Sequence, residues 1–318
     1  KKERRRQSTV PTFEEIAVKW WHHERDKWVD SHADRVMKRL ADNSFKALGR
    51  LPADQVTPLQ VIDVIKKIEA RDALDVANRV KQCIKAVYRY AIQHGIVTTN
   101  PAGDLDGIVK ARKVTHRPSL PKKELPEFLN CLEGYSKRGR ILTQLSIKLL
   151  VLTFVRSIEI RGARWEEFDL EANLWRIPAE RMKMKVEHLV PLSQQSIDVI
   201  QRIRVITGRY ELVFPSEVNR TKTMSDNTMR QAVFRMGFDG KTLGKSKAVP
   251  HGYRATASSI LNEEGFNPDA IERQLAHQER NGVRAAYTHH ARYIDERSKM
   301  MQWWGDFLDA QASSYCAE

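Results

Sequence analysis

Residues 251–287 read HGYRATASSILNEEGFNPDAIERQLAHQERNGVRAAY and predict two consecutive helices that carry several chemically active side chains. His251 and Arg254 open the first helix, and their spacing of three residues places both on one helix face. The second helix ends at His277, and Tyr287 follows ten residues later. This one segment therefore supplies two histidines, an arginine and a tyrosine.

A further arginine follows another predicted helix upstream. The apolar segment 140–155 has the length and composition of a buried helix, and Arg156 comes directly after it. Glu159 lies three residues later, where its carboxylate is able to orient the guanidinium. The pair adds a second arginine to the set.

These residue types suit metal-independent cleavage of a phosphodiester. Such cleavage needs a side-chain nucleophile, cations that hold the charge on the phosphate oxygens, and a proton donor for the departing oxygen. Arginine binds two phosphate oxygens with its planar fork and keeps its charge. A tyrosine phosphate ester conserves the energy of the broken bond for religation. No carboxylate cluster, HExxH or GxSxG motif points to a metal or serine mechanism.

The composition favours a nucleic-acid partner. Lys and Arg number 54 against 40 Asp and Glu, and the net charge of +14 favours a polyanion, with an anionic membrane surface as the competing partner. No apolar run approaches the roughly 18–20 residues of a membrane span, and no signal peptide leads the chain. The cysteines lie too far apart for a disulfide framework or a zinc site: Cys83, Cys131 and Cys316.

Two other signals fail the requirements of the sites they resemble. Gly240–Ser246 is spaced like a phosphate-binding loop, but Asp239 occupies the place of its first glycine. The pairs His22-His23 and His289-His290 are adjacent residues, which point about 100° apart on a helix and form no metal site by themselves.

The C-terminal half predicts further helices around a small antiparallel hairpin. Strand-like runs cover residues 174–178 and 188–192, and residues 181–187 form the tip between them. The expected helices cover residues 140–155, 194–206, 226–236, 251–264, 268–277, 284–289 and 293–308.

Residues 12–110 predict a separate helical domain. Its clearest helix spans residues 74–94 and has one continuous apolar stripe. The opposite face carries Lys81, Lys85 and Arg89, which either contact DNA phosphates or are simply solvated.

Basic segments flank this domain. Residues 1–11 open with five Lys or Arg in six positions and are typical of a linker from an upstream domain. Residues 111–120 combine proline with charge and predict an interdomain linker. Here Lys110, Arg112 and Lys113 would suit a strap across a DNA backbone, or a linker that is merely soluble.

The order of these groups resembles that of the tyrosine recombinases, also called phage-type integrases. That family carries an Arg-x-x-Glu box, a hairpin lysine, a His-x-x-Arg box, a Leu-(Gly/Ala)-His and a later tyrosine. The corresponding residues here are Arg156–Glu159, Lys183, His251–Arg254, Leu275–His277 and Tyr287. Residues 154–169, Met182–Met184 and Met300–Trp304 look most like integrases of satellite phages and genomic islands.

The resemblance covers the whole chain and implies a mainly α fold with a small antiparallel sheet. Residues 12–110 would form a helical, SAM-like core-binding domain, and residues 121–318 an α+β catalytic domain with a C-terminal tail helix. Residues 1–11 would lead from an N-terminal arm-binding domain, which we expect to be absent from this chain. Met300–Leu308 would pack either on a neighbouring subunit or on its own domain.

By this resemblance Tyr287 is the nucleophile, which attacks DNA to leave a 3′-phosphotyrosine and a free 5′-hydroxyl. His251 would take the tyrosine proton, and Lys183 would be the general acid for the 5′-oxygen. Tyr293 is the rival nucleophile, and Lys185, on the same side of an alternating hairpin, is the rival acid.

The resemblance assigns the remaining polar residues to the phosphate. Arg156 and Arg254 would clamp the non-bridging oxygens of the transition state, and His277 would hydrogen-bond the phosphate. Glu159 would orient the arginine box. No metal, nucleotide or other cofactor would be needed.

The implied function is that of a site-specific DNA recombinase that inserts or excises a prophage or genomic island. Its partners would be double-stranded DNA attachment sites, other copies of the chain in a homotetramer on paired sites, and possible DNA-bending and excision accessory proteins. The expected location is the bacterial cytoplasm, at the nucleoid. Two alternatives stay open: a type IB topoisomerase without a defined site, and a DNA-binding regulator with an inactive catalytic fold.

Overall fold

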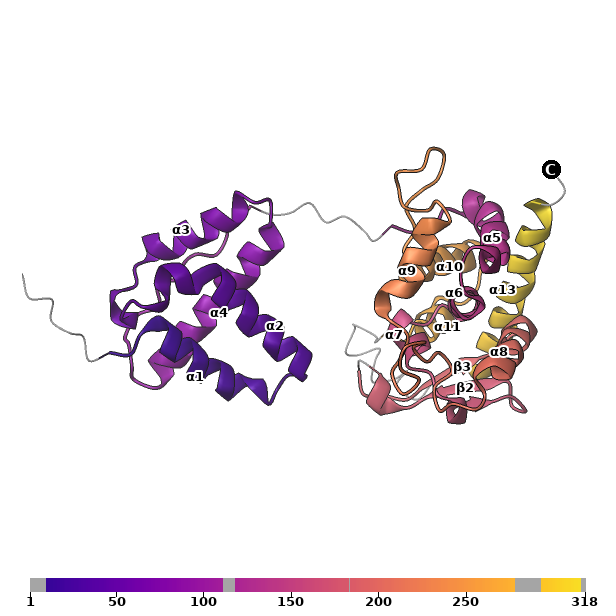
Figure 1. Ribbon diagram of the computed structural model, residues 1–318, viewed down its shortest axis with the longest axis horizontal. Helices are drawn as coiled ribbons and strands as arrows, with labels where there is room; N and C mark the ends of the chain where they lie inside the picture. Colours follow the sequence, from indigo (N-terminus) through magenta and orange to yellow (C-terminus); the bar gives the residue numbers. More distant parts are fainter. Residues whose placement is uncertain (1–9, 111–117, 183, 278–292, 316–318) are drawn as a thin grey trace, which may run out of the picture. The chain divides into compact units, whose positions relative to one another are not determined.

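The computed structural model describes residues 10–110, 118–182, 184–277 and 293–315 and divides the chain into two compact units (Figure 1). The smaller unit spans Lys1–Thr115 and the larger His116–Glu318. The described elements are mostly helices, and the strands among them form one small antiparallel sheet. The predicted fold class, mainly α with a small antiparallel sheet, is confirmed.

The smaller unit consists of helices. They are α1 (Phe13–Arg25), α2 (Asp30–Leu40), the π-helix η1 (Ala41–Gly49), the 3₁₀ turn η2 (Ala53–Gln55), α3 (Pro58–Glu69) and α4 (Leu74–Gln93). Capping boxes begin two of them, with Thr12 and Glu15 at α1 and Thr57 and Gln60 at α3. Each box satisfies main-chain N–H groups that the first helical turn leaves without partners.

The core of the smaller unit forms against one face of α4. Val80 and Ile84 are fully buried there, and the ring of Tyr88 stacks on Phe13 of α1 with centroids 5.8 Å apart. The Tyr88 hydroxyl donates to the carbonyl of Ala53 at 3.0 Å, so its polar end is also satisfied. The apolar stripe predicted from the sequence thus faces this core.

The larger unit is built around α6 (Ile141–Thr153). This helix is apolar on nearly all sides, and a helix of that kind belongs in a core. It packs against α5 (Leu125–Glu133), α8 (Gln194–Thr207), α9 (Asp226–Arg235) and α13 (Ile294–Tyr315). The other described helices are α7 (Ser157–Arg161), α10 (Gly252–Glu263) and α11 (Pro268–Gln274), with short 3₁₀ turns η3 (Lys122–Glu124), η4 (Gly134–Lys137), η5 (Trp165–Glu167) and η6 (Ala179–Arg181).

The sheet has the strand order β1 (Phe168–Asp169), β2 (Leu174–Ile177) and β3 (His188–Pro191), with both pairs antiparallel. β2 and β3 form the predicted hairpin, in which Ile177 lies opposite His188 at the end nearer the connecting segment. All four residues of β3 are buried. The sequence pattern does not predict β1, because two residues are too few to show alternation.

α13 continues to Tyr315, beyond the end expected at residue 308. The residues of its inner face are buried within the larger unit itself: Met300, Met301, Trp304 and Leu308. The Trp304 indole donates to the carbonyl of Val151 in α6 at 3.0 Å. Of the two packings expected for Met300–Leu308, the structure therefore shows the one on its own unit.

No described helix combines the length and the apolar composition that a membrane crossing requires. The helix expected at residues 284–289 lies outside the described residues. Lys183 and Tyr287 lie outside them as well.

Candidate active site

Arg156 occupies the N-cap position of α7, directly after the end of α6. Phe154 ends α6 in a left-handed conformation with φ 37°, which turns the chain toward Arg156. The Arg156 main-chain N–H donates to Glu159 Oε2 at 2.7 Å, and its Nη1 donates to Oε1 at 2.9 Å. Because the side chain of Glu159 is only 2% exposed, this carboxylate holds the arginine in one orientation.

Arg254 lies in the first turn of α10 and is buried, with 5% exposure. Its Nη1 donates to the carbonyl of Phe154 at 2.8 Å, and its Nη2 donates to the carbonyl of Leu275. Burial and the positive charge of Arg156, opposed by Glu159 and Glu272, together lower the pKa of Arg254 to about 10. The guanidinium therefore remains charged at neutral pH.

The end of α11 holds both guanidinium groups. The carbonyl of Leu275 accepts from Arg254, and that of Ala276 accepts from Arg156 Nη2 at 3.2 Å. The last carbonyls of a helix have no partners within it and carry partial negative charge, which favours cations here. We call these two consecutive residues, Leu275 and Ala276, the carbonyl row.

His277 follows the carbonyl row. Its Nδ1 lies 2.8 Å from Glu272 Oε2, and its Nε2 lies 3.3 Å from Arg254 Nη2. A carboxylate partner makes Nδ1 the donor, which leaves Nε2 to face the arginine. Arg156, Arg254 and His277 are thus brought together by hydrogen bonds to one turn of chain.

His251 is the N-cap residue of α10 and is half-buried. The next residue, Gly252, packs so closely on the chain at Pro118 that an added Cβ would lie 2.0 Å from the Pro118 carbonyl oxygen. Only glycine fits at this position, and the close contact between Gly252 and Pro118 fixes the start of α10 at His251. His251 and Arg254 therefore leave the same helix end, three residues apart.

His188 is a polar residue of this region that the sequence analysis did not single out. It is 5% exposed, and burial together with the positive charges of Arg297, Arg156 and Arg254 lowers its pKa to about 3. The sequence signal is slight, because in His188–Pro191 the histidine simply stands at a buried position of a short strand.

Arg297 and Gln274 form a buried polar layer beside His188. Arg297 Nε donates to Gln274 Oε1 at 3.1 Å, and the Gln274 amide donates to the carbonyl of Thr153 at 3.1 Å. Arg297 Nη2 also donates to the carbonyl of Leu189 in β3. This layer joins α6, α11, α13 and β3, and burial lowers the pKa of Arg297 to about 9.

The basic face expected on α4 differs from the prediction at Lys81. Lys81 is 6% exposed, and its Nζ donates to the carbonyl of Leu105 and to Asp106 Oδ1, each at 3.1 Å. Lys85 reaches the other Asp106 oxygen at 3.0 Å. A spacing of four residues points both lysines at the same following turn, so Lys81 is no part of an exposed face. Arg89 is exposed.

The linker candidates lie at the boundary of the described chain. Lys110 is exposed, and its main-chain N–H donates to Glu69 Oε1 at 3.1 Å. Arg112 and Lys113 lie outside the described residues.

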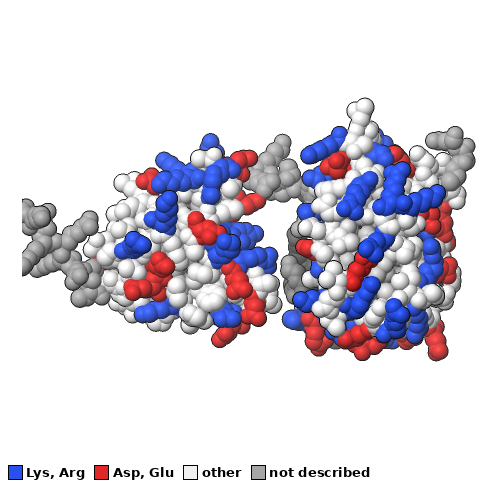
Figure 2. Space-filling model, viewed as in Figure 1, with Lys and Arg blue, Asp and Glu red and all other residues white. Residues whose placement is uncertain are grey.

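Lys and Arg side chains are spread over the visible face of each unit (Figure 2). On the larger unit they gather over the upper and central part of that face, and Asp and Glu gather along its lower edge. The described residues bring no three His, Cys, Asp or Glu side chains together in a way that would hold a metal ion.

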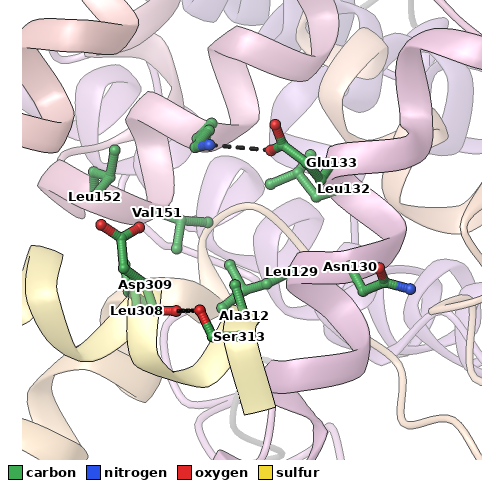
Figure 3. Close-up of a pocket in the computed structure, with 11 residues that line it drawn as sticks. Leu129, Asn130, Leu132, Glu133, Val151, Leu152, Leu308, Asp309, Ala312 and Ser313 are labelled. Atoms are coloured by element: carbon green, nitrogen blue, oxygen red, sulfur yellow. Dashed lines mark hydrogen bonds and ion pairs between the residues drawn. The ribbon is translucent and has the colours of Figure 1, made fainter. Parts of the chain in front are cut away.

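A cavity of about 260 Å³ lies between α5, α6 and α13 (Figure 3). Its lining is largely apolar, with an ion pair of 3.0 Å between Lys148 and Glu133 at its edge. None of the residues predicted for catalysis lines it. The candidate site is therefore the cluster at the carbonyl row and not this cavity.

Two family models match the chain. Residues 13–108 match the phage integrase central domain, and residues 118–293 match the phage integrase family. The integrase of Enterobacteria phage P4 is 43% identical over 99% of this chain and 73% of the relative. The putative protein IntB of Escherichia coli K12 is 40% identical over 97% of this chain and 80% of the relative.

Solved structures share the fold at low sequence identity. A lambda integrase dimer bound to a COC′ core site has a TM-score of 0.69 at 15% identity, over 87% of this chain and 77% of that one. A lambda integrase tetramer bound to a Holliday junction has a TM-score of 0.69 at 14% identity, over 85% and 79%. The Tn1549 transposon integrase in complex with circular intermediate DNA has a TM-score of 0.64 at 18% identity, over 91% and 99%.

Proposed function

The chain belongs to the phage integrase family of tyrosine recombinases, and we propose that it cleaves and rejoins duplex DNA at defined sites through a 3′-phosphotyrosine intermediate. The observation that carries this proposal is the joint anchoring of Arg156 and Arg254 on the carbonyl row, with His277 beside them. Two fixed guanidinium groups with an adjacent imidazole form a receptor for one phosphate.

The substrate in this proposal is a pair of attachment sites whose recombination inserts or excises a prophage or genomic island. The relatives are named integrases and prophage integrases, and a structural neighbour is a tetramer bound to a Holliday junction. We therefore assign this chain a homotetramer on two paired duplexes, with DNA-bending and excision proteins as further partners. The net charge of +14 suits such a polyanionic substrate.

The two guanidinium groups supply the electrostatic stabilisation. Each has five N–H donors, and contacts with the described residues occupy two for Arg156 and three for Arg254, one of the three being the contact with His277. The other donors are left for the non-bridging phosphate oxygens, whose charge grows in the transition state. His277 has Nδ1 held by Glu272 at 2.8 Å, and its Nε2 exchanges the contact with Arg254 for a hydrogen bond to the same phosphate when DNA is bound.

In the cleavage step the Tyr287 oxygen forms a bond to phosphorus, and the bond from phosphorus to the 5′-oxygen breaks. The phenolic proton passes to His251, and Lys183 gives a proton to the departing 5′-oxygen. The products are a 3′-phosphotyrosine and a 5′-hydroxyl. Religation runs the same transfers in reverse with a 5′-hydroxyl of the partner duplex, so the bond energy is conserved.

A nicked duplex tests this chemistry directly. The substrate carries a junction sequence of the element with a nick just past the cleavage position, so that the released fragment diffuses away and the covalent complex accumulates. We expect a slow-migrating, protease-sensitive band with wild-type protein. Tyr287→Phe should abolish the band and leave DNA affinity nearly unchanged, because only the attacking hydroxyl is lost.

Tyr293→Phe is the matched control, because Tyr293 is the rival nucleophile. Loss of the band in Tyr293→Phe with retention in Tyr287→Phe would move the nucleophile to residue 293. Binding without any covalent band would indicate a DNA-binding regulator, and relaxation of plasmids that lack the site would indicate a topoisomerase.

A further inference from the structure

Arg181 is the last residue of η6, and its side chain reaches α7, the helix that carries Arg156 and Glu159. Its Nη2 donates to the main-chain carbonyl of Glu159. The guanidinium lies against Gly162, where an added Cβ would lie 3.0 Å from Nη2. Because the Arg181 side chain is only 17% exposed, this contact is made inside the larger unit.

The carbonyl of Glu159 belongs to the last turn of α7, where the carbonyls of a helix lack donors within it. The N–H of Ala163, four residues on, donates to Ile160 instead. Arg181 therefore supplies the donor that the Glu159 carbonyl needs. A cation suits this place, because the C-terminal end of a helix carries partial negative charge.

Glu167 holds Arg181 in this position. Both carboxylate oxygens of Glu167 accept from Arg181 Nη1, and Oε2 also accepts from the indole of Trp175 at 2.9 Å. The Glu167 side chain is only 3% exposed, and Trp175 is fully buried in β2. Charge-assisted hydrogen bonds of this kind fix the orientation of a guanidinium. The sheet thus fixes Arg181 against α7 through Trp175 and Glu167.

We propose that Arg181 is a positioning residue for strand cleavage, which holds α7 at the Glu159 carbonyl and thereby holds Arg156 in the proposed phosphate receptor. Glu159 meets Arg181 through its main chain and Arg156 through its carboxylate. A displacement of α7 therefore moves the Arg156 guanidinium with it. This inference rests on the proposed function, and it adds a residue that acts through Glu159 and Arg156.

The variants separate the hold of Arg181 on α7 from the buried ion pair. Arg181→Met alone would leave the buried Glu167 carboxylate without its cation, which is strongly destabilising. We therefore combine it with Glu167→Gln, whose uncharged amide oxygen still accepts from Trp175. Glu167→Gln alone is the matched control, because it keeps Arg181 and the donor to the Glu159 carbonyl.

The first measurement is the rate of covalent-complex formation on the nicked duplex at saturating DNA, with DNA affinity and the melting temperature recorded for each variant. We expect Glu167→Gln with Arg181→Met to cleave on the order of 10²-fold more slowly than Glu167→Gln alone, as a small displacement of a catalytic group does. The two should bind DNA equally. Glu167→Gln alone should cleave close to the wild-type rate.

The second measurement adds Arg156→Ala. It uses a duplex in which a methyl group replaces one non-bridging oxygen of the scissile phosphate, because this uncharged diester has less need of a cation. The defect of the double variant should largely disappear on this duplex. In the background of Arg156→Ala the double variant should cause no further loss, because residues that act through one another are not additive.

A third substrate tests the rival route through Lys183, which lies two residues after Arg181 in the sequence. It carries sulfur in place of the bridging 5′-oxygen, and a thiolate leaves without protonation. The double variant should stay slow on this substrate, because its defect lies at the non-bridging oxygens and not at the leaving group.

Equal cleavage by the double variant and Glu167→Gln would overturn the inference. The same holds for a loss that multiplies with that of Arg156→Ala, or a defect that the sulfur substrate relieves. Absence of any covalent complex with the wild-type protein would contradict the proposed function itself.

Discussion

Single side chains determine the geometry of the proposed phosphate receptor, and Glu159 is the plainest case. Both of its carboxylate oxygens hold Arg156, one through the main-chain N–H and one through Nη1. Glu159→Gln keeps one acceptor and replaces the charge by an amide that is unable to accept from both groups. We expect cleavage of the nicked duplex to slow at least about tenfold, with a loss of about 1–3 kcal/mol in the free energy of unfolding.

Glu166→Gln provides the control for this change, because Glu166 is an exposed carboxylate in the same region of the chain. It should leave the cleavage rate and the stability as they are. If both variants lost cleavage rate and stability equally, the cause would be the change in overall charge and not the hydrogen bonds between Glu159 and Arg156.

His188 gives the pH dependence of stability a definite sign. Its pKa in the folded protein is lowered to about 3, below the ordinary value of 6.5. Between these values the unfolded chain binds a proton that the folded chain does not, so His188 destabilises the fold progressively as the pH falls below 6.5. The slope from this residue reaches about 1.4 kcal/mol per pH unit.

His188→Asn should remove that slope. Between roughly pH 4.5 and 7.5, His188 titrates only in the unfolded chain. We expect the free energy of unfolding, measured with urea across this range, to depend less on pH in the variant than in the wild type. Parallel curves would show that His188 takes up its proton in the folded protein.

The sequence indicates which charged residues belong to the candidate site but not what holds them together. Arg156, Arg254 and His277 were predicted for one site, and the structure joins all three through the end of α11. The carbonyl row is formed by main-chain atoms. Every residue has a main-chain carbonyl, so the sequence does not indicate which ones bind the arginines. His188 escaped notice because a lone histidine in an apolar strand carries no motif.

At the scale of helices and strands, the long periodic segments were the predictable ones. α4 and α6 follow the expected ranges closely, because a continuous stripe or a wholly apolar run defines a helix without reference to its neighbours. The π-helix η1 and the two-residue strand β1 depend on tertiary contacts and gave no such signal. The end of α13 is polar and half-exposed, so its continuation to Tyr315 has no apolar period.

α13 stabilises the larger unit through the residues that it buries. Leu308 is 4% exposed and belongs to the main apolar core of that unit. Leu308→Ala should lower the free energy of unfolding by about 2–5 kcal/mol, through lost burial and the cavity that remains. Calorimetry of the full chain would show this as a lower melting temperature for the transition of the larger unit.

Leu243→Ala is the matched control, since Leu243 is fully exposed in the same unit. It should leave that transition within about 0.5 kcal/mol of the wild type. A comparable loss at both positions would mean that Leu308 is not part of a packed core.

At the scale of the whole molecule, net charge and local structure have to be considered together. A charge of +14 argues for a polyanionic substrate but does not say which cations face it. Lys81 shows the difference, because its ammonium is buried and contacts Asp106 and the Leu105 carbonyl within the fold. A helical wheel places Lys81 and Arg89 alike on a charged face, and only the turn at residues 103–106 distinguishes them.

Salt dependence measures this distinction in the full chain. Affinity for duplex DNA should fall steeply with salt, by about 10³-fold or more between roughly 50 and 200 mM if six or more phosphates are contacted. Arg89→Met should reduce the slope of log K against log salt by about 0.9 if this exposed cation contacts a phosphate. Lys81→Met should leave the slope unchanged while lowering stability, because its charge is already paired inside the protein.

A slope that falls in Lys81→Met and not in Arg89→Met would show that DNA binding opens the Lys81–Asp106 contact. A slope near zero in the wild type would contradict a phosphate-binding surface altogether.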